Sequence, residues 1–279
     1  MKKITQQNPL LSVIENIIRS NIYLFIFFRY LTNKFFATII YETDFKILFF
    51  LRNSSFLKKK LIVDIGANDG ISIKIIRKFV KNKIVSFEPN IQNYKKIKLL
   101  KKKDNSIIAY NLGLSNIEAN KVPIFGAFFN GYHLSPFDSL LKTNVIKHLK
   151  ESLFIKDIVN KVVIKKSIIK ITKLDTFKFK PCFIKIDIQG HEFECIEGAI
   201  KTIKKSKPII MVEYDPIIIN RIYKVLKVLG YKKFYFLSNK EKLFEHKKEK
   251  VFNIFFIHNS LLKELNDKLK VTYFDNNKT

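Results

Sequence analysis

From residue 61 onward, short apolar runs alternate with segments of helical periodicity, and this alternation constrains the fold more than any other feature. Apolar runs at residues 61–65, 83–87, 106–111, 182–187 and 209–213 predict buried strands. The segments that follow several of these runs carry apolar residues on one face of a helix, as at Phe193, Ile196, Ile200 and Ile203. Such alternation is typical of βαβ units. We therefore predict an α/β fold built on a mostly parallel sheet.

The domain boundaries follow from where this rhythm begins, breaks and ends. It breaks over about 120–172, where a helix over 139–149 and a β-rich run over 162–171 are predicted; an insertion of this length usually carries specificity or a lid. Residues 231–237 and 251–257 predict an antiparallel edge hairpin joined by a charged loop at 240–250. We predict one domain over 61–258, preceded by a mostly helical extension over 1–60 and followed by a C-terminal helix and tail over 259–279.

The N-terminal region leaves two interpretations open. Residues 22–41 are rich in Phe and Ile, but Arg29, Asn33 and Lys34 interrupt them before a membrane-spanning length is reached. One interpretation is a helix that packs on the domain, and the other is an interfacial helix that lies on a membrane. Polar residues 5–8 and then Pro9 stand where a signal peptide needs its apolar segment.

The two cysteines also bear on the compartment. Cys182 and Cys195 show neither metal-ligand spacing nor a disulfide framework, which favours a reducing compartment. We expect a cytoplasmic protein, and the alternative is one that contacts the inner face of the membrane peripherally through its N-terminal region.

The net charge of +28 is spread almost evenly along the chain and is not gathered in one patch. Only five of the 52 basic residues are Arg, the side chain best suited to bidentate contacts with nucleic acid. Compositional drift toward Lys explains this pattern, so no specific nucleic-acid partner is expected. The basic surface still attracts anionic material in a salt-dependent way.

A small-residue loop lies where the first predicted strand meets the first predicted helix. The segment DIGANDG, from Asp64 to Gly70, places backbone N–H groups at the crevice of an open α/β sheet, where small residues permit a ligand to approach closely. Its G-x-x-x-G spacing is neither the dinucleotide pattern nor a P-loop. Glu88 closes the second strand, where a carboxylate can accept hydrogen bonds from a ribose. Alternatively, Asp64 and Glu88 only cap the helices that follow them.

Five segments stand in a fixed order along the chain: VDIGANDG, SFEPN, TKLDTF, FIKIDIQGHEFECIEGA and PIIMVEYD. This series resembles the FkbM-type family of S-adenosylmethionine (SAM)-dependent methyltransferases over about residues 61–257. The most specific segment is FIKIDIQGHEFECIEGA, in which the matching residues are Lys185, Asp187, Gln189, Gly190, Glu192, Gly198 and Ala199.

The resemblance implies a class I methyltransferase Rossmann-like fold, with seven strands, an antiparallel last strand and helices on both faces. It implies that SAM binds across the glycine loop, that Glu88 holds the ribose, that the turn at Leu114 and Ser115 flanks the adenine, and that Asp187 faces the transferable methyl group. Family members mainly carry out O-methylation, often of sugar hydroxyls. The implied cofactor-binding residues are Asp64, Gly66, Ala67, Asn68, Gly70, Glu88, Leu114, Ser115 and Asp187.

Methyl transfer to a weakly acidic sugar hydroxyl needs a positioned base. We expect Asp187, His191 and Glu213 to form the catalytic group, with His191 as first choice for the base because its ordinary pKa is near neutrality. The alternative is that His191 is a solvated residue in the first turn of a helix. Glu192 is expected to satisfy helix N–H groups, and Lys185, on a buried strand, to pair with a carboxylate.

Other site assignments stay open or are left out. Asp187 and Glu213 could hold magnesium, but no His/Cys cluster supports zinc or iron, and no metal is assigned. His133 lies in the insertion, which could cover the acceptor.

The function expected from the sequence is O-methylation of a sugar hydroxyl in a glycan or lipid-linked saccharide, as in polysaccharide biosynthesis. Two alternatives keep the same fold. One is an RNA or DNA methyltransferase or nucleic-acid-binding protein, and the other is a non-catalytic protein of the membrane surface.

Overall fold

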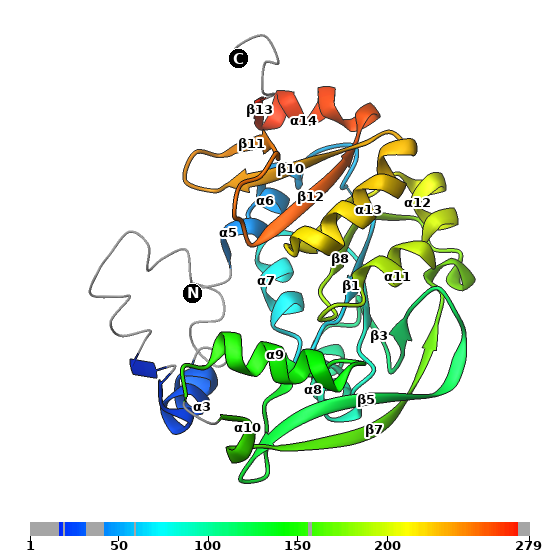
Figure 1. Ribbon diagram of the computed structural model, residues 1–279. Coiled ribbons are helices and arrows are strands. Elements are labelled where there is room, and N and C mark those ends of the chain that lie inside the picture. Colours follow the sequence, from blue (N-terminus) through cyan, green and yellow to red (C-terminus); the bar gives the residue numbers. More distant parts are fainter. Residues whose placement is uncertain (1–16, 19, 32–41, 59, 156–157, 273–279) are drawn as a thin grey trace. The chain divides into compact units, whose positions relative to one another are not determined.

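The computed structural model describes residues 17–18, 20–31, 42–58, 60–155 and 158–272 (Figure 1). These residues fall into two compact units. The larger unit comprises the described residues of 42–121 and of the chain from Ile169 onward, and the smaller unit comprises those up to Leu31 together with 122–168. The boundaries between the units fall within two long strands, β5 (Ala119–Phe129) and β7 (Val163–Thr172).

The larger unit is built on a sheet with the strand order β13-β11-β10-β12-β9-β8-β1-β2-β3. The five strands from β3 to β9 run parallel, and β12 runs antiparallel to both β9 and β10. The strands are β1 (Leu61–Ile65), β2 (Ile84–Phe87), β3 (Ile107–Tyr110), β8 (Pro181–Ile186), β9 (Ile209–Glu213), β10 (Tyr231–Leu237), β11 (Lys242–Glu245), β12 (Asn253–His258) and β13 (Lys270–Thr272). The mostly parallel sheet predicted from the sequence is confirmed.

Two details of the predicted sheet need correction. In the described chain the sheet has nine strands and not seven, because β11 and β13 extend it beyond β10. The segment 240–250, predicted to be a loop, therefore contains β11. The predicted pairing of 231–237 with 251–257 is present, but β12 lies between β10 and β9 and forms no edge hairpin.

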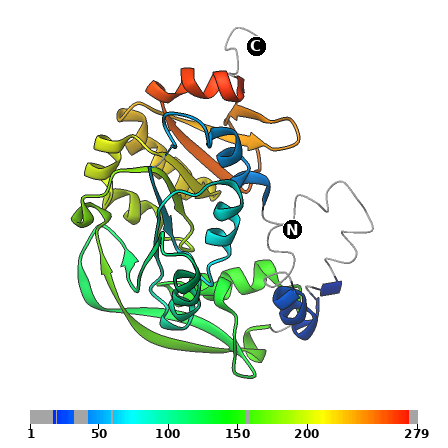
Figure 2. The same cartoon turned by 180° about the vertical axis from the view of Figure 1, so that it is seen from behind.

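Side-chain alternation along the strands gives the sheet two apolar faces. Ile62 belongs to one core cluster and its neighbour Val63 to the other, as the two-residue period of a strand requires. The first face is covered by α5 (Glu42–Phe45), α6 (Ile47–Leu51), α7 (Ile71–Phe79), α8 (Ile91–Lys103) and α14 (Leu262–Lys268). The second is covered by α11 (Glu192–Glu197), α12 (Ile200–Ser206) and α13 (Pro216–Val228). Figures 1 and 2 show these helices on opposite sides of the sheet.

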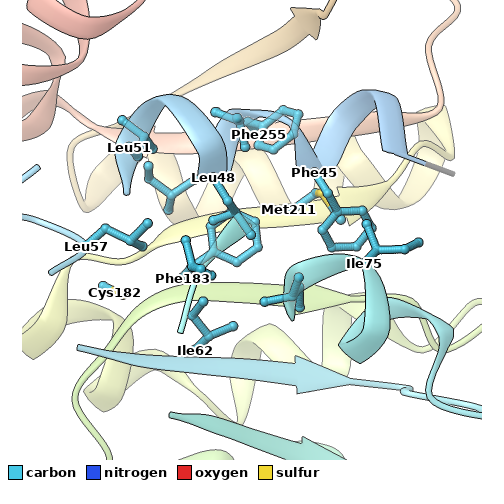
Figure 3. Close-up of a cluster of buried hydrophobic side chains, with 14 of the residues drawn as sticks. Phe45, Leu48, Leu51, Leu57, Ile62, Ile75, Cys182, Phe183, Met211 and Phe255 are labelled. Atoms are coloured by element: carbon cyan, nitrogen blue, oxygen red, sulfur yellow. The ribbon is translucent and has the colours of Figure 1, made fainter. Parts of the chain in front are cut away.

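Residues 42–58 are part of the larger unit, although the sequence placed them in the N-terminal extension. Phe45, Leu48 and Leu51 point toward the sheet and pack in the same cluster as Ile62 and Phe183 (Figure 3). Leu48 is fully buried. Because burial of such side chains stabilises a core by about 1.5–3 kcal/mol each, this segment belongs to the sheet that it covers.

The helix predicted after β8 is divided into α11 and α12. A Cβ on Gly198 would lie 1.9 Å from the backbone oxygen of Ser115, so the chain comes too close to that turn for any larger residue. The new N-terminus is capped from outside the helix: the carboxylate of Asp175 accepts hydrogen bonds from the N–H groups of Lys201 and Thr202. Asp175 lies in a 3-10 turn, Leu174–Phe177.

The smaller unit has its own core. It contains α3 (Ile22–Leu31), β6 (Tyr132–His133), α9 (Lys142–Ser152), α10 (Ile158–Lys161) and parts of β5 and β7. Ile22 packs there with Ala127, Phe137 and Leu149. The helix predicted over 139–149 corresponds to α9, and the β-rich run to β7. The rest of the segment 22–41, and residues 5–9, lie outside the described residues.

Two further findings concern the compartment. Over the described part of the chain, no helix is both long and apolar enough to cross a membrane. Cys182 and Cys195 are buried and carry free thiols.

Candidate functional site

The glycine loop follows β1 and is held against the neighbouring strand ends. The N–H groups of Gly66 and Ala67 both donate to the carbonyl oxygen of Phe87, at 3.0 and 3.2 Å. Gly66 has a φ of +74°, and a Cβ there would lie 1.9 Å from the backbone oxygen of Asp187. Only glycine fits this position. The close approach that the sequence predicted is thus made first of all by the protein's own backbone.

Gly70 ends the loop and begins α7. It has a φ of +83°, and a Cβ there would meet the side chain of Leu100 on α8 at 2.5 Å. Ala67 is buried, whereas Asn68 is half-buried. The loop therefore turns sharply at both of its glycines, and neither position has room for a side chain between β1 and α7.

Glu88 faces this loop from the end of β2. One carboxylate oxygen accepts a hydrogen bond from the N–H of Asn68 at 2.8 Å, and the other accepts from the N–H of Asn90 at 2.9 Å. The cap of α8 is Asn90, whose side chain accepts from the N–H of Gln92. Glu88 is buried, and its carboxylate contacts both the glycine loop at Asn68 and the N-cap of α8 at Asn90. Its role as a ligand of the ribose stays a prediction.

Lys185 connects the loop to two carboxylates. It is paired in register with Asp64 on β1, so both side chains lie on the same face of the sheet. Its Nζ lies 2.8 Å from the carbonyl oxygen of Gly66, 3.5 Å from Asp64 Oδ1 and 3.4 Å from Asp187 Oδ2. Burial alone would lower the pKa of Lys185, but the charges of Asp187 and Asp64 raise it above its ordinary value. The ammonium is therefore kept charged, with the carboxylate partners that the sequence predicted.

Asp64 is fully buried. Besides the contact with Lys185, its Oδ2 accepts a hydrogen bond from Ser72 Oγ at 2.6 Å. Its side chain thus ties β1 to the first turn of α7. Its assignment as a direct cofactor ligand stays a prediction.

Gln189, a residue of the family resemblance to which the sequence assigned no role, links Asp187 and Glu213 at the ends of β8 and β9. Gln189 Nε2 donates to Asp187 Oδ1 and to Glu213 Oε2, both at 3.0 Å. Loss of hydration and the nearby charges of Asp187 and Glu192 raise the pKa of Glu213 to about 8, although its surface is exposed.

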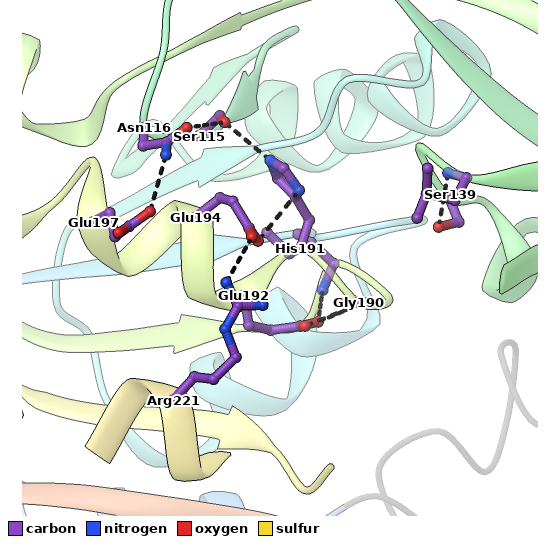
Figure 4. Close-up of polar contacts among 11 residues, drawn as sticks. Ser115, Asn116, Ser139, Gly190, His191, Glu192, Glu194, Glu197 and Arg221 are labelled. Atoms are coloured by element: carbon purple, nitrogen blue, oxygen red, sulfur yellow. Dashed lines mark hydrogen bonds and ion pairs between the residues drawn. The ribbon is translucent and has the colours of Figure 1, made fainter. Parts of the chain in front are cut away.

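His191 is engaged at both ring nitrogens (Figure 4). Its Nε2 lies 2.9 Å from Ser115 Oγ, and its Nδ1 lies 3.5 Å from Glu194, whose carboxylate in turn meets Arg221 at 3.4 Å. Burial lowers the pKa of His191 and outweighs the charge of Glu194. His191 is half-buried, so the alternative of a freely solvated residue does not describe it. Its role as the base stays a prediction.

The serine of this contact is no nucleophile. A Ser–His–Glu series resembles a hydrolytic triad in composition, but Ser115 is only 1% exposed and no substrate reaches its hydroxyl. Ser115 and the buried Leu114 form the turn that was expected to flank the adenine, and His191 fixes that turn to the start of α11.

Glu192 accepts hydrogen bonds from backbone N–H groups, but these belong to the loop before α11 and not, as the sequence indicated, to the helix. It is 3% exposed, and its carboxylate accepts hydrogen bonds from the N–H groups of Ile188 and Gly190 (Figure 4). It therefore shapes the loop after β8 and has little contact with solvent.

Other candidate ligands are arranged differently. Within the described ranges, no group of three or more His, Cys, Asp and Glu side chains could hold a metal ion. In the smaller unit His133 donates to or accepts from Asp138 Oδ1 at 2.7 Å and stacks on Phe128. A Cβ on Gly126 would lie 2.6 Å from the same Asp138 oxygen, so this pair packs tightly on the strand.

Comparisons with known proteins show which family and which solved structures the chain is similar to. The model of the methyltransferase FkbM domain family matches residues 64–233. A solved FkbM methyltransferase from Methylobacillus flagellatus is 14% identical with a TM-score of 0.41; the alignment covers 75% of this chain and 48% of that protein, so the chain spans about half of its length. A TehB-like SAM-dependent methyltransferase from Corynebacterium glutamicum is 8% identical with a TM-score of 0.41, covering 83% and 93%. No curated protein matches.

The contact at Gly66 generates a prediction about folding. Gly66→Ala should destabilise the larger unit by more than Gly230→Ala, because both replace a glycine at positive φ, at a cost of about 1–2 kcal/mol, but only the first adds a 1.9 Å clash with backbone. At Gly230 the nearest atom is 3.1 Å away on the ring of His258. Urea denaturation measures both. Equal midpoints for the two variants would contradict the tight contact between the loop and Asp187.

Proposed function

This chain belongs to the methyltransferase FkbM family, whose methyl donor is SAM, and we propose that it methylates a hydroxyl group on a sugar of a glycan or lipid-linked saccharide. The family match covers the glycine loop, Glu88 and the strand ends described above. It supports methyl transfer directly, whereas the hydroxyl and the sugar are inferred from the chemistry of the site and from the family resemblance.

The residues at the ends of β1 and β2 fit the adenosyl part of SAM. The loop from Gly66 to Gly70 has small residues at its turns, so its backbone lies close to the start of α7. Two backbone N–H groups hold Glu88 beside this loop. A carboxylate fixed in this way is suited to accept hydrogen bonds from both ribose hydroxyls. We assign the adenine to the turn at Leu114 and Ser115, and the methyl-bearing end to the side of Asp187.

Bound SAM supplies an electrophilic methyl group on a positively charged sulfur. The protein's tasks are then to align the acceptor and to take up its proton. Asp187 and Glu213 put two carboxyl groups at adjacent strand ends, and the pKa of Glu213, raised to about 8, lies close to working pH. This pair is the observation that carries the proposal of a hydroxyl acceptor, since a hydroxyl needs a base and a carboxyl of raised pKa can serve as one.

The first prediction tests the donor site. Glu88→Ala should weaken SAM binding by about 1–3 kcal/mol, the scale of a lost charged hydrogen bond. Isothermal titration calorimetry on the whole chain measures the difference, with Glu118→Ala, an exposed glutamate, as the matched control. Absence of SAM binding by the folded wild-type protein would overturn the proposed function.

The second prediction tests the acceptor. Deleting the gene should remove one methyl group from a cell-surface glycan or its lipid-linked precursor, and the wild-type gene should restore it. Mass spectrometry of purified glycans detects the loss of a methylene mass. Unchanged glycans together with lost methylation of RNA or DNA would favour the nucleic-acid alternative.

We also propose that the enzyme is cytoplasmic and contacts an anionic membrane through α3. Tyr23, Phe27 and Tyr30 recur along one face of this helix and are 64%, 54% and 52% exposed, while Ile22 is buried. Aromatic side chains of this kind favour the interfacial region of a bilayer, and the net charge of +28 favours anionic lipid. The buried free thiols of Cys182 and Cys195 are compatible with a reducing compartment.

The membrane contact makes a third prediction. Replacing Tyr23, Phe27 and Tyr30 with serine should reduce flotation of the protein with phosphatidylglycerol vesicles by at least about tenfold, because the interfacial aromatic contact is lost. The control replaces Ile217 and Val228, two exposed apolar residues of α13, with serine. If both variants float like the wild-type protein, α3 does not bind the membrane.

A further inference from the structure

We propose that Glu213 is the general base of methyl transfer and that Gln189 is the positioning residue that holds it against Asp187. This inference deepens the proposed function and rests on it. It assigns a task to a side chain that the sequence motif contains but that neither the motif nor the family match explains.

The contacts of Gln189 fix its orientation. Its Nε2 lies 3.0 Å from one oxygen of Asp187 and 3.0 Å from one oxygen of Glu213. An amide NH2 group has two hydrogens, so each carboxyl group receives one. The amide oxygen in the same place would face two acceptors and repel both, which settles which end of the amide points there.

The backbone at Gln189 adopts a strained conformation that points its amide toward the two carboxyl groups. Its φ is +55°, a left-handed conformation that side chains other than Gly, Asn and Asp rarely adopt. The buried carboxylate of Glu192 stabilises this turn, because it accepts hydrogen bonds from the N–H groups of the residues before and after Gln189, Ile188 and Gly190. A strained turn with a dedicated hydrogen-bond anchor presents the amide between the two strand ends.

The surrounding charges decide which carboxyl group holds a proton. Lys185 lies 3.4 Å from Asp187 Oδ2 and offsets that charge. Glu213 faces Asp187, which directly follows β8, and Glu192 on α11. Its register partner on β12 is Asn253, whose side-chain amide donates to Asp44 of α5. Lys185 favours ionised Glu213 less than the carboxylates oppose it. Burial and these neighbouring carboxylates together raise the pKa of Glu213, which is therefore the carboxyl group suited to take up a proton.

The other candidates for the base are already engaged or inaccessible. Both ring nitrogens of His191 have partners, Ser115 and Glu194. Glu192 is buried with its oxygens on backbone N–H groups. Glu213 is exposed, so an acceptor can reach it from solvent.

The proton and electron balance is simple. As the acceptor oxygen forms its bond to the methyl carbon, the electron pair of the breaking carbon–sulfur bond stays on sulfur, and the hydroxyl proton passes to ionised Glu213. Ionised Glu213 is the active form, so turnover should rise with pH through about 8.

Titration of the carboxyl group tests the inference without donor or acceptor. Nuclear magnetic resonance of the full chain, with isotope-labelled glutamate carboxyl carbons, should show one group that titrates near 8 and that is missing in Glu213→Gln. In Gln189→Met the pKa of Glu213 should rise further, because the amide that donates to the ionised carboxylate is lost while burial and the charge of Asp187 remain. Gln92→Met, at an exposed glutamine of α8, is the matched control. Asp187→Asn should instead lower the pKa of Glu213, because a negative charge that raises it is removed, and this variant keeps the test available if Gln189→Met does not fold.

Activity completes the test. With SAM and the glycan fraction from cells that lack the gene, Glu213→Gln should reduce kcat about 100-fold or more, and Gln189→Met should move the pH profile to higher pH. A wild-type Glu213 that titrates near 4.5, or a value near 8 that persists in Gln189→Met, overturns the inference. Those results leave SAM binding intact, whereas failure of SAM binding with a carboxyl that titrates near 8 overturns the proposed function instead.

Discussion

The buried ammonium of Lys185 is the interaction on which the rest of the site depends. Its Nζ lies within 3.5 Å of a backbone oxygen of the glycine loop and of carboxylates from two strands. A buried charge is tolerated only when partners compensate it, so these three groups must stay together in the folded protein. The ammonium thus fixes the loop at Gly66, keeps Asp64 inside the sheet, and offsets the charge of Asp187. Asp187 and Glu213 can then lie side by side at the strand ends.

The register between β1 and β8 explains why Lys185 and its carboxylate partners lie together. Asp64 and Lys185 are register partners on parallel strands, and the two-residue period points both side chains to the face covered by α7. Asp187 continues the same alternation one step beyond β8, and Glu213 ends the adjacent strand. One polar column therefore crosses otherwise apolar strands at the edge where ligands bind in open α/β sheets.

Much of this could be predicted from the sequence, and the failures have physical causes. Apolar periodicity located β1, β2, β8, β9 and α13 because the pattern of buried side chains within each element is local in sequence. It could not place residues 42–58, whose burial depends on contacts with strands far along the chain, as Phe45 and Leu48 show. The division at Gly198 depends on the turn at Ser115, and the role of Gln189 depends on a carboxyl group 24 residues away. Neither long-range contact leaves a local pattern.

Asp175 shows that a signature segment of the family can serve the fold instead of the donor site. It stands in TKLDTF, one of the segments that carry the family resemblance, yet its carboxylate caps the N-terminus of α12. A harmful substitution there would act on how much enzyme accumulates in the cell, and the molecules that did fold would work at the normal rate. Natural variants of this protein should therefore be sorted by abundance before any of them is counted as a defect in chemistry.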